Sequence, residues 1–507
     1  MLYKINKNLV FCNFEHRGII DVEFQPQKII KERVLKMKSF TRLLFIFSLL
    51  FIITSCSQQP SGKLTDEQVE EIVKRSYQYV ALYNVNNKFA FAEKGMSTGG
   101  YNKGIRNIQL LDHTVKAIAR PNNDALYQMA MLDLRKDSAV FTFPAFDSKY
   151  VSLMATGYDH YVNIPLSTTN GDFKKPITVL FYTQRTDNYK GEAIEGVDKI
   201  FEMTGDFISL VLRVMPHANE PDRFKRIVEQ INNIQGVSLS EFQGKAKLEE
   251  DPINFPKYGE TDADIFENNL LEVMQFVFNH TTFNTTNALD QGILNAYKPL
   301  GIEPGKIYDP ANAFKIDGKR FREVSLRIKN EELAKMNNPE LASTLLPMLF
   351  QTKDKMMLEP MLLQSIVGPI GVPMREAMYP PVVSSDGNPL NAQNDYVISM
   401  TKAELPPANG FWSLTLYDTE NGFFIPNDYK KYSVGENAGM KLDADGGIKI
   451  YVSSVKPDGV PLENWLPINR KDQGIDIILR VYAPDLEKMK TWEAPKAEKI
   501  SKIEKNS

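Results

Sequence analysis

The densest group of polar side chains in the 507-residue chain is the run from Arg120 to Asp124, with Tyr127 close behind. An arginine guanidinium is a planar fork of donors that suits a carboxylate or a phosphate. Asp124 and Tyr127 would then line the same pocket. The same residue types also predict a tight turn, because proline fixes φ and Asn and Asp bond to their own backbone. The candidate pocket residues from this run are Arg120, Asn122, Asn123, Asp124 and Tyr127.

Two further acids could work with Asp124 as a general acid and base. Asp159 and Asp418 each follow a stretch of strand-forming residues. Glycoside hydrolysis needs two carboxyl groups roughly 5–10 Å apart, a distance that sequence does not supply. The alternative role for each is a hydrogen-bonded aspartate at a turn or strand end.

Aromatic side chains offer a second kind of binding group. Trp412 and Trp465 are two of only three tryptophans. Their faces could stack on sugar rings or apolar ligands, or they could fill a core. Asn464 precedes Trp465 and would place it in a loop at the mouth of a sandwich.

No motif predicts a metal or a cofactor. His113, His160, His217 and His280 are far apart, and no zinc motif, phosphate-binding loop or dinucleotide fingerprint occurs. The formal net charge of −3 provides no positive field for nucleic acid. Two cysteines in the whole chain exclude a disulfide scaffold.

The second cysteine lies in a signal that predicts a lipid anchor. Lys38 and Arg42 precede an apolar run from Leu43 to Ile53, and Thr54-Ser55-Cys56 follows. A basic head, a short apolar stretch and small residues before a cleavage point are typical of a secretory signal peptide. The ending resembles a bacterial lipobox, in which the cysteine becomes the lipidated first residue. The alternative is an uncleaved N-terminal anchor helix, which would also place the body outside the cytoplasm. We therefore expect a bacterial cell-envelope protein, lipid-anchored through Cys56 and facing the periplasm or the surface.

Residues 1–36 precede this signal and include Cys12. A signal peptide should begin near the start of a chain. We therefore interpret residues 1–36 as an upstream extension assigned by mistake, with translation beginning at Met37. A real cytoplasmic extension is the alternative.

The remaining chain changes its pattern along its length. A capping box at Thr65 predicts a helix that continues through Val80. Short Val-, Phe-, Tyr- and Thr-rich runs from Val115 to Leu180 predict antiparallel strands of a sandwich. Helical spacing returns at 223–234, 264–278 and 339–364, and strands dominate from Tyr396 to Tyr482.

Several stretches together resemble a known two-domain bacterial family. They are Arg120–Tyr127 with Leu132–Leu134, Asp159–Asn163, Gly205–Arg213, Phe411–Asp418, Lys431–Gly435, Asp445-Gly446, Asn464–Pro467 and Arg480–Pro484. The first three resemble the N-terminal domain of unknown function 1254, and the rest resemble the C-terminal domain of unknown function 1214. The resemblance implies a mainly β fold: an immunoglobulin-like sandwich, a helical middle and a C-terminal jelly-roll-like sandwich. It implies a helix at Gly205–Arg213 and no settled activity. Ala125 replaces the expected threonine, and Arg480 joins the candidate pocket residues.

These predictions divide the chain into an extension (1–36), a lipoprotein signal peptide (37–55), a tether (56–63), a helix with a β-sandwich domain (64–240), a helical linker domain (241–365), a jelly-roll-like domain (366–495) and a charged tail (496–507). We expect an envelope lipoprotein that binds a small ligand or serves as an accessory protein. The alternative is an envelope hydrolase for a glycan-like or small amphiphilic substrate, using carboxylate acid and base chemistry. The membrane, through the lipid, is one partner, nucleic acid is not, and a homo-oligomer stays open.

Overall fold

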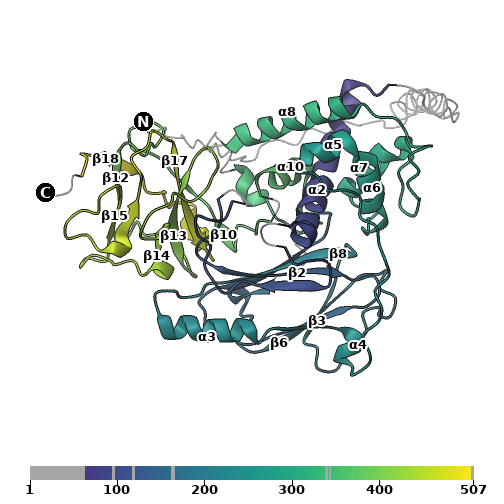
Figure 1. Ribbon diagram of the computed structural model, residues 1–507, viewed down its shortest axis with the longest axis horizontal. Coiled ribbons are helices and arrows are strands. Elements are labelled where there is room, and N and C mark those ends of the chain that lie inside the picture. The colour runs from purple at the N-terminus through teal and green to yellow at the C-terminus, as the bar shows by residue number, and fades with distance from the viewer. Residues whose placement is uncertain are drawn as a thin grey trace, which may run out of the picture. The chain divides into compact units, whose positions relative to one another are not determined.

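The structure is a computed structural model that describes residues 63–93, 97–116, 120–161, 166–336, 341, 344–368 and 370–503. The predicted extension, signal peptide and Cys56 lie outside the described residues, as does nearly all of the tether. Within the described part, mainly β-sheet structure flanks a helical segment, which confirms the expected fold class (Figure 1).

The first sandwich pairs a five-stranded sheet with a four-stranded one. In spatial order the first sheet contains β1 (Lys103–Arg106), β2 (Leu126–Asp133), β8 (Phe207–Val214), β4 (Val151–Thr156) and β5 (Leu166–Ser167). The second contains β7 (Lys199–Glu202), β6 (Ile177–Tyr182), β3 (Ala139–Phe143) and β9 (Gln235–Ser238). Neighbours are antiparallel except β6 and β7. Helix α3 (Pro221–Asn232) contributes Ile227 and Ile231 to the core between the sheets, and α4 (Leu239–Phe242) follows β9.

The expected helix at Gly205–Arg213 is wrong, because residues 207–214 form strand β8. Every residue of β8 is buried, and the strand pairs with β2 on one side and β4 on the other. Its sequence is a nearly continuous apolar run interrupted by Ser209 and Arg213. Such a run is typical of a strand that is covered on both faces. Arg213 is therefore a charged residue on the buried central strand of the five-stranded sheet.

Helices form a second layer over the sheet that contains β2 and β8 (Figure 1). They are α2 (Asp66–Phe91), α5 (Asp262–Asn268), α6 (Leu270–Asn279), α7 (Ala288–Tyr297), α8 (Gly318–Met336) and α10 (Leu358–Val367). Thr65 caps α2 as predicted, since its hydroxyl accepts from Gln68 N and the Gln68 side chain accepts from Thr65 N. Helix α2 packs among α5–α8 and α10, and Met131 and Phe207 of the five-stranded sheet belong to the same core.

The second sandwich contains the C-terminal strands. One sheet has the order β10 (Ala377–Met378), β17 (Ile475–Tyr482), β13 (Trp412–Asp418) and β14 (Ser433–Gly435), and β11 (Pro381–Val382) also pairs with β17. The other has the order β16 (Trp465–Pro467), β15 (Ile448–Ser453), β12 (Asp395–Met400) and β18 (Ala497–Ile500). The short helix α11 (Leu486–Met489) follows β17.

The expected charged tail is partly ordered as β18. This strand pairs with β12, and Ala497 is fully buried. Asp395 then accepts a hydrogen bond from Ile503 N at 2.7 Å. Pairing with the edge of β12 satisfies backbone groups that would otherwise be open, which explains why a charged segment is held here.

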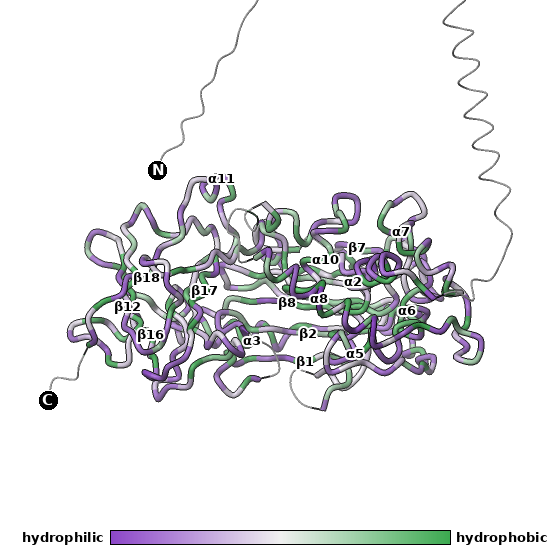
Figure 2. The backbone as a smooth tube through the Cα atoms, turned by 90° about the horizontal axis from the view of Figure 1, so that it is seen from above, coloured by the Kyte–Doolittle hydropathy of each residue, from purple (hydrophilic) through white to green (hydrophobic). Residues whose placement is uncertain are grey.

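The hydrophobic residues of all three parts gather inward, and hydrophobic and hydrophilic stretches alternate along the tube in Figure 2. Among the described residues, no helix is long and apolar enough to cross a membrane.

Candidate functional site

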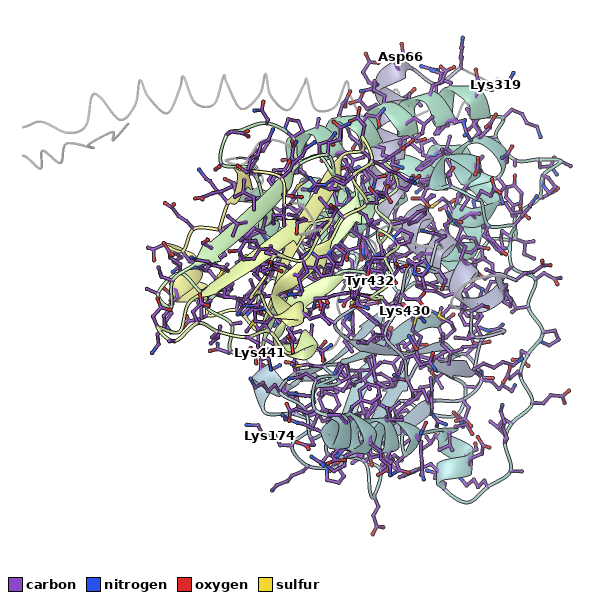
Figure 3. The ribbon with its side chains drawn as sticks, turned by 60° about the vertical axis from the view of Figure 1, so that its left-hand side comes forward. Asp66, Lys174, Lys319, Lys430, Tyr432 and Lys441 are labelled. Atoms are coloured by element: carbon purple, nitrogen blue, oxygen red, sulfur yellow. The ribbon has the colours of Figure 1, made fainter. Side chains whose placement is uncertain are left out.

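The polar run from Arg120 to Asp124 joins the first sandwich to the second. It lies directly before β2, and its side chains and backbone bond to residues of β13, β14 and β17. Three of the hydrogen bonds across this contact are Asn122 Nδ2 to Tyr482 Oη (2.6 Å), Tyr417 Oη to the carbonyl oxygen of Pro121 (2.6 Å) and Ser433 Oγ to Asn123 Oδ1 (3.1 Å). Nearby, Tyr432, labelled in Figure 3, contacts His113, with Tyr432 Oη 2.6 Å from Nδ1. We call residues 120–124 the seam.

Arg120 itself lies at the exposed edge of the seam. Its backbone has a φ of 52°, in the left-handed region, and its N–H donates to the carbonyl oxygen of Gly422 at 2.6 Å. Its guanidinium donates to Asp476 Oδ2 at 2.5 Å. Because this fork is already paired with a carboxylate, Arg120 is better explained as a link to the second sandwich than as the main ligand-binding cation.

Asp124 is buried inside the seam. Ser413 Oγ on β13 donates to Asp124 Oδ2 at 2.6 Å, and Asp124 N donates to Asn122 Oδ1. Burial raises the pKa of Asp124, while the Arg480 guanidinium and the Ser413 hydroxyl act in the opposite direction. Asp124 does not line the large cleft described below. These contacts support the turn interpretation of the sequence for Asp124.

Replacement of Asp124 by asparagine should change stability in a pH-dependent way. Because the folded-state pKa of Asp124 is raised above 3.8, the folded protein holds this proton more tightly than the unfolded chain does. The stabilisation of the folded state by Asp124 is thus present below about pH 4 and is lost as the pH rises through the pKa of Asp124 in the folded protein. We expect Asp124→Asn, compared with the wild type in urea unfolding, to be relatively more stable at about pH 8 than at about pH 4. A relative stability that falls with pH would contradict the raised pKa.

Arg480 on β17 is the buried cation that contacts the seam. Its Nη2 donates to Tyr417 Oη at 2.7 Å and to the carbonyl oxygen of Arg120 at 3.2 Å. Its guanidinium also lies 5.5 Å from the centre of the Tyr417 ring. Nη1 has no hydrogen-bond partner, although Arg480 is only 4% exposed.

A cleft of about 2950 Å³ lies beside the seam. Its walls include residues of α2, the sheet face formed by β2 and β8, the segments 346–350 and 370–374, and the second sandwich. Met129, Val211, Phe350 and Val372 are among its apolar lining residues. This volume exceeds the roughly 300–1,000 Å³ of ordinary ligand pockets. All three parts of the described chain therefore contribute to one cleft.

Polar groups from facing elements meet in this cleft. Tyr127 on β2 lies opposite Arg213 on β8, whose guanidinium is 5.6 Å from the Tyr127 ring centre. Arg480 comes from β17, and Tyr379 from the link between β10 and β11. Of the predicted pocket residues, the structure brings Arg120, Asn122, Tyr127 and Arg480 together at the cleft.

Tyr379 borders the cleft and is 44% exposed. Burial raises the pKa of Tyr379, as does Tyr127, whereas the guanidinium groups of Arg213 and Arg480 lower it. Both arginines are thus close enough to act on the same phenol.

The other predicted site residues lie elsewhere. Asp159 is buried near the helices, where Lys353 Nζ lies 4.0 Å from its Oδ2. Asp418 accepts hydrogen bonds from Asn421 N (2.6 Å) and Phe423 N (3.0 Å), as a strand-end aspartate does. Neither acid lines the cleft.

The two tryptophans are core residues rather than stacking platforms. Trp412 is 3% exposed, within the core of the second sandwich, and Trp465 is 2% exposed. Trp465 Nε1 donates to the carbonyl oxygen of Ser453 at 3.0 Å, which satisfies its one polar group. Asn464 bonds to the backbone of Lys441 and fixes the adjoining loop. These three residues do not border the cleft.

The sequence prediction missed Arg213 and Tyr379. A signal for Arg213 was present, because a single arginine within a continuous apolar run has to be buried with the strand around it. No comparable signal existed for Tyr379, which reaches the cleft through the pairing of β10 and β11 with the distant strand β17. Among the described residues, no cluster of three His, Cys, Asp or Glu side chains could hold a metal ion.

Comparisons with known proteins agree with the two-sandwich architecture. A crystal structure of the VPA0106 protein from Vibrio parahaemolyticus has 23% sequence identity and a TM-score of 0.63, covering 85% of this chain and 100% of that one. At this identity the likeness shows the fold alone. An uncharacterised protein from Burkholderia cenocepacia has 13% identity and a TM-score of 0.39, covering 86% of this chain and 94% of that one. No curated protein matches the chain.

Two family models match the chain in order. Residues 102–235 match the protein of unknown function DUF1254, and residues 376–486 match the protein of unknown function DUF1214. The first match covers the first sandwich through the start of β9, and the second covers most of the second sandwich. The chain therefore carries a DUF1254 match followed by a DUF1214 match, in a two-domain arrangement.

Proposed function

We propose that this protein is a lipid-anchored cell-envelope protein that binds a small molecule in the cleft between its two sandwiches and its helices. The observation that carries the proposal is the cleft itself, about 2950 Å³ in volume, with convergent polar groups set in apolar walls. Such a combination is the usual form of a small-molecule site. The seam supports this role, because it holds the second sandwich against the first.

A cleft-filling substitution tests the binding proposal. Met374 lines the cleft and is half-buried, so tryptophan at this position should reduce the space with little cost to the fold. The matched control is Met357→Trp, because Met357 is 52% exposed and lies outside the cleft. Native mass spectrometry of protein purified from its own envelope should show a small molecule bound to the wild type and to Met357→Trp. Full retention of that molecule by Met374→Trp would contradict the proposed site.

A carboxylate-based envelope hydrolase has less support. Its candidate acids Asp124, Asp159 and Asp418 do not line the cleft, and Asp124 is engaged by Ser413. If an envelope extract yields a substrate, Asp124→Asn should leave its turnover unchanged. A turnover lost in that variant, with its fold intact, would favour the hydrolase.

The lipid anchor has its own test, which depends on sequence alone. Cys56→Ser removes the thiol that forms the thioether to diacylglycerol. We expect this variant to leave the membrane fraction and to lose fatty-acid labelling, whereas Cys12→Ser should behave like the wild type. Continued labelling of Cys56→Ser would contradict the anchor.

A further inference from the structure

Arg213 is a buried cation for which the described residues provide no counter-ion. The residue is 5% exposed, and none of the ion pairs in the described part of the chain includes it. Its Nη2 donates to the carbonyl oxygen of Ile370 at 3.0 Å, and Nη1 has no hydrogen-bond partner. Buried charges in proteins are almost always paired or coordinated, because removing an ion from water is costly. Arg213 therefore has unused capacity for an anion.

The neighbouring acids do not fill this role. Glu376 and Arg213 both lie near the Tyr150 phenol and shift its pKa in opposite directions, Glu376 upward and Arg213 downward. The Glu376 oxygens, however, accept hydrogen bonds from Tyr150, Ser167 and Thr169. Asp124 accepts a hydrogen bond from Ser413, and its nearby cation is Arg480. Neither Asp124 nor Glu376 lines the cleft, whereas the guanidinium groups of Arg213 and Arg480 both do.

The cleft supplies groups that could contact an anion directly. Arg213, Arg480, Tyr127 and Tyr379 all line it. The two phenols project from different sandwiches, and each can donate its O–H to an oxygen of a ligand. Because the cleft is lined by protein, the attraction between an anion and the buried guanidinium groups is screened less than in bulk water.

The remaining walls favour an apolar body. Met129 and Val211 lie next to Tyr127 and Arg213 on the same two strands, and Phe350, Ile370 and Val372 also line the cleft. The Phe350 ring lies over Gly371, where an added Cβ would come within 2.0 Å of a ring carbon. The Phe350 ring therefore packs directly on the backbone at Gly371, and Phe350 lies beside Ile370 and Val372 in the cleft wall.

We infer that the cleft binds an amphiphilic anion, with a carboxylate or phosphate head at Tyr127 and Tyr379 beside Arg213 and Arg480, and an apolar tail along Met129, Val211 and Phe350. This inference rests on the proposed function and narrows its ligand class. The observation that favours an anionic ligand over a small molecule of any charge is the buried Arg213, which has no ion-pair partner among the described residues.

Binding of matched amphiphiles by the full chain carrying Cys56→Ser, in detergent-free buffer below each probe's critical micelle concentration, tests the inference. Calorimetry would compare dodecanoate and dodecyl phosphate with dodecanol and with dodecyltrimethylammonium. We expect at least one anion to bind about 10- to 100-fold more tightly than dodecanol, as a charged hydrogen-bonding head requires. The tighter anion identifies the head group. Equal affinity for dodecanol, preference for the cation, or no binding of any probe would overturn the inference.

Variants then assign the head group to Arg213. Arg213→Gln should weaken the binding of the anion about 10- to 100-fold and leave the affinity for dodecanol unchanged. Arg213→Lys should keep part of the preference for the anion because it keeps the positive charge. Lys174→Gln is the control, since Lys174 is an exposed cation outside the cleft and should change the affinity for the anion less than about twofold. Should Arg213→Gln fail to fold, Arg213→Lys and the wild-type probe series still decide the question. An unchanged preference for anions in a folded Arg213→Gln would overturn the assignment.

The two proposals can fail separately. A neutral or cationic molecule that is bound to the wild type and displaced by Met374→Trp would leave the proposed function intact and overturn the amphiphilic anion. Full retention of the bound molecule by Met374→Trp would overturn the site itself.

Discussion

Arg480→Gln should lower the free energy of unfolding by about 3 kcal/mol. The substitution removes the cation near the buried Asp124 and the donor to Tyr417 Oη. It also removes the bond to the backbone carbonyl of Arg120. Loss of one partner of a buried charged group is costly because the other group stays out of water without compensation. Urea unfolding followed by tryptophan fluorescence would measure the change, since Trp412 lies on β13 beside β17.

Arg120→Gln is the matched control for Arg480→Gln. Both arginines belong to the contact between the sandwiches, but the Arg120 side chain is 44% exposed and its partner Asp476 is 27% exposed. Exposed ion pairs contribute about 0–1 kcal/mol, so we expect a loss of that size. Equal losses for the two variants would show that burial of Arg480 does not govern the stability of the seam.

Glu376→Ala should also be strongly destabilising, by about 3 kcal/mol. Glu376 lies just before β10, and its carboxylate accepts hydrogen bonds from three hydroxyl groups of the first sandwich. These donors are Ser167 Oγ (2.9 Å), Thr169 Oγ1 (3.1 Å) and Tyr150 Oη (3.3 Å). Alanine would leave buried hydroxyls without an acceptor, and each such group carries a desolvation cost. Urea unfolding would measure the loss.

Glu436→Ala provides the comparison for Glu376→Ala. Glu436 also connects the two sandwiches, through an ion pair with Lys149, but both side chains are partly exposed. We expect a loss of at most about 1 kcal/mol. A larger loss for Glu436→Ala than for Glu376→Ala would contradict the role of the buried network.

Local patterns predicted much of the fold. The capping box at Thr65 marked the start of α2, and the strand-forming runs after Tyr396 predicted β12, β13, β15 and β17. These features depend on neighbours a few residues apart, which sequence shows directly. The helix expected at Gly205–Arg213 failed because it rested on resemblance, whereas the apolar run itself is typical of a buried strand.

The candidate site depends on long-range pairing that no local pattern contains. Arg480 reaches the seam because β17 lies between β10 and β13, and Asp124 meets Ser413 although 289 positions separate them. The polar run from Arg120 to Asp124 stands out in the sequence as a dense cluster. Its role as a contact between sandwiches depends on the register of β13 and β17, which only the assembled fold supplies.

The position of a heavy atom in a bound ligand would show directly whether the cleft binds an amphiphilic anion with its head beside Arg213 and Arg480. Crystals of the protein grown with 12-bromododecanoate, measured at the bromine absorption edge, would locate both ends of one molecule. We expect carboxylate density within hydrogen-bonding distance of Tyr127 or Tyr379, beside Arg213, and the bromine peak among the apolar walls near Met129 and Phe350. An occupied site outside the cleft, or a carboxylate pointing away from Arg213 and Arg480, would contradict it.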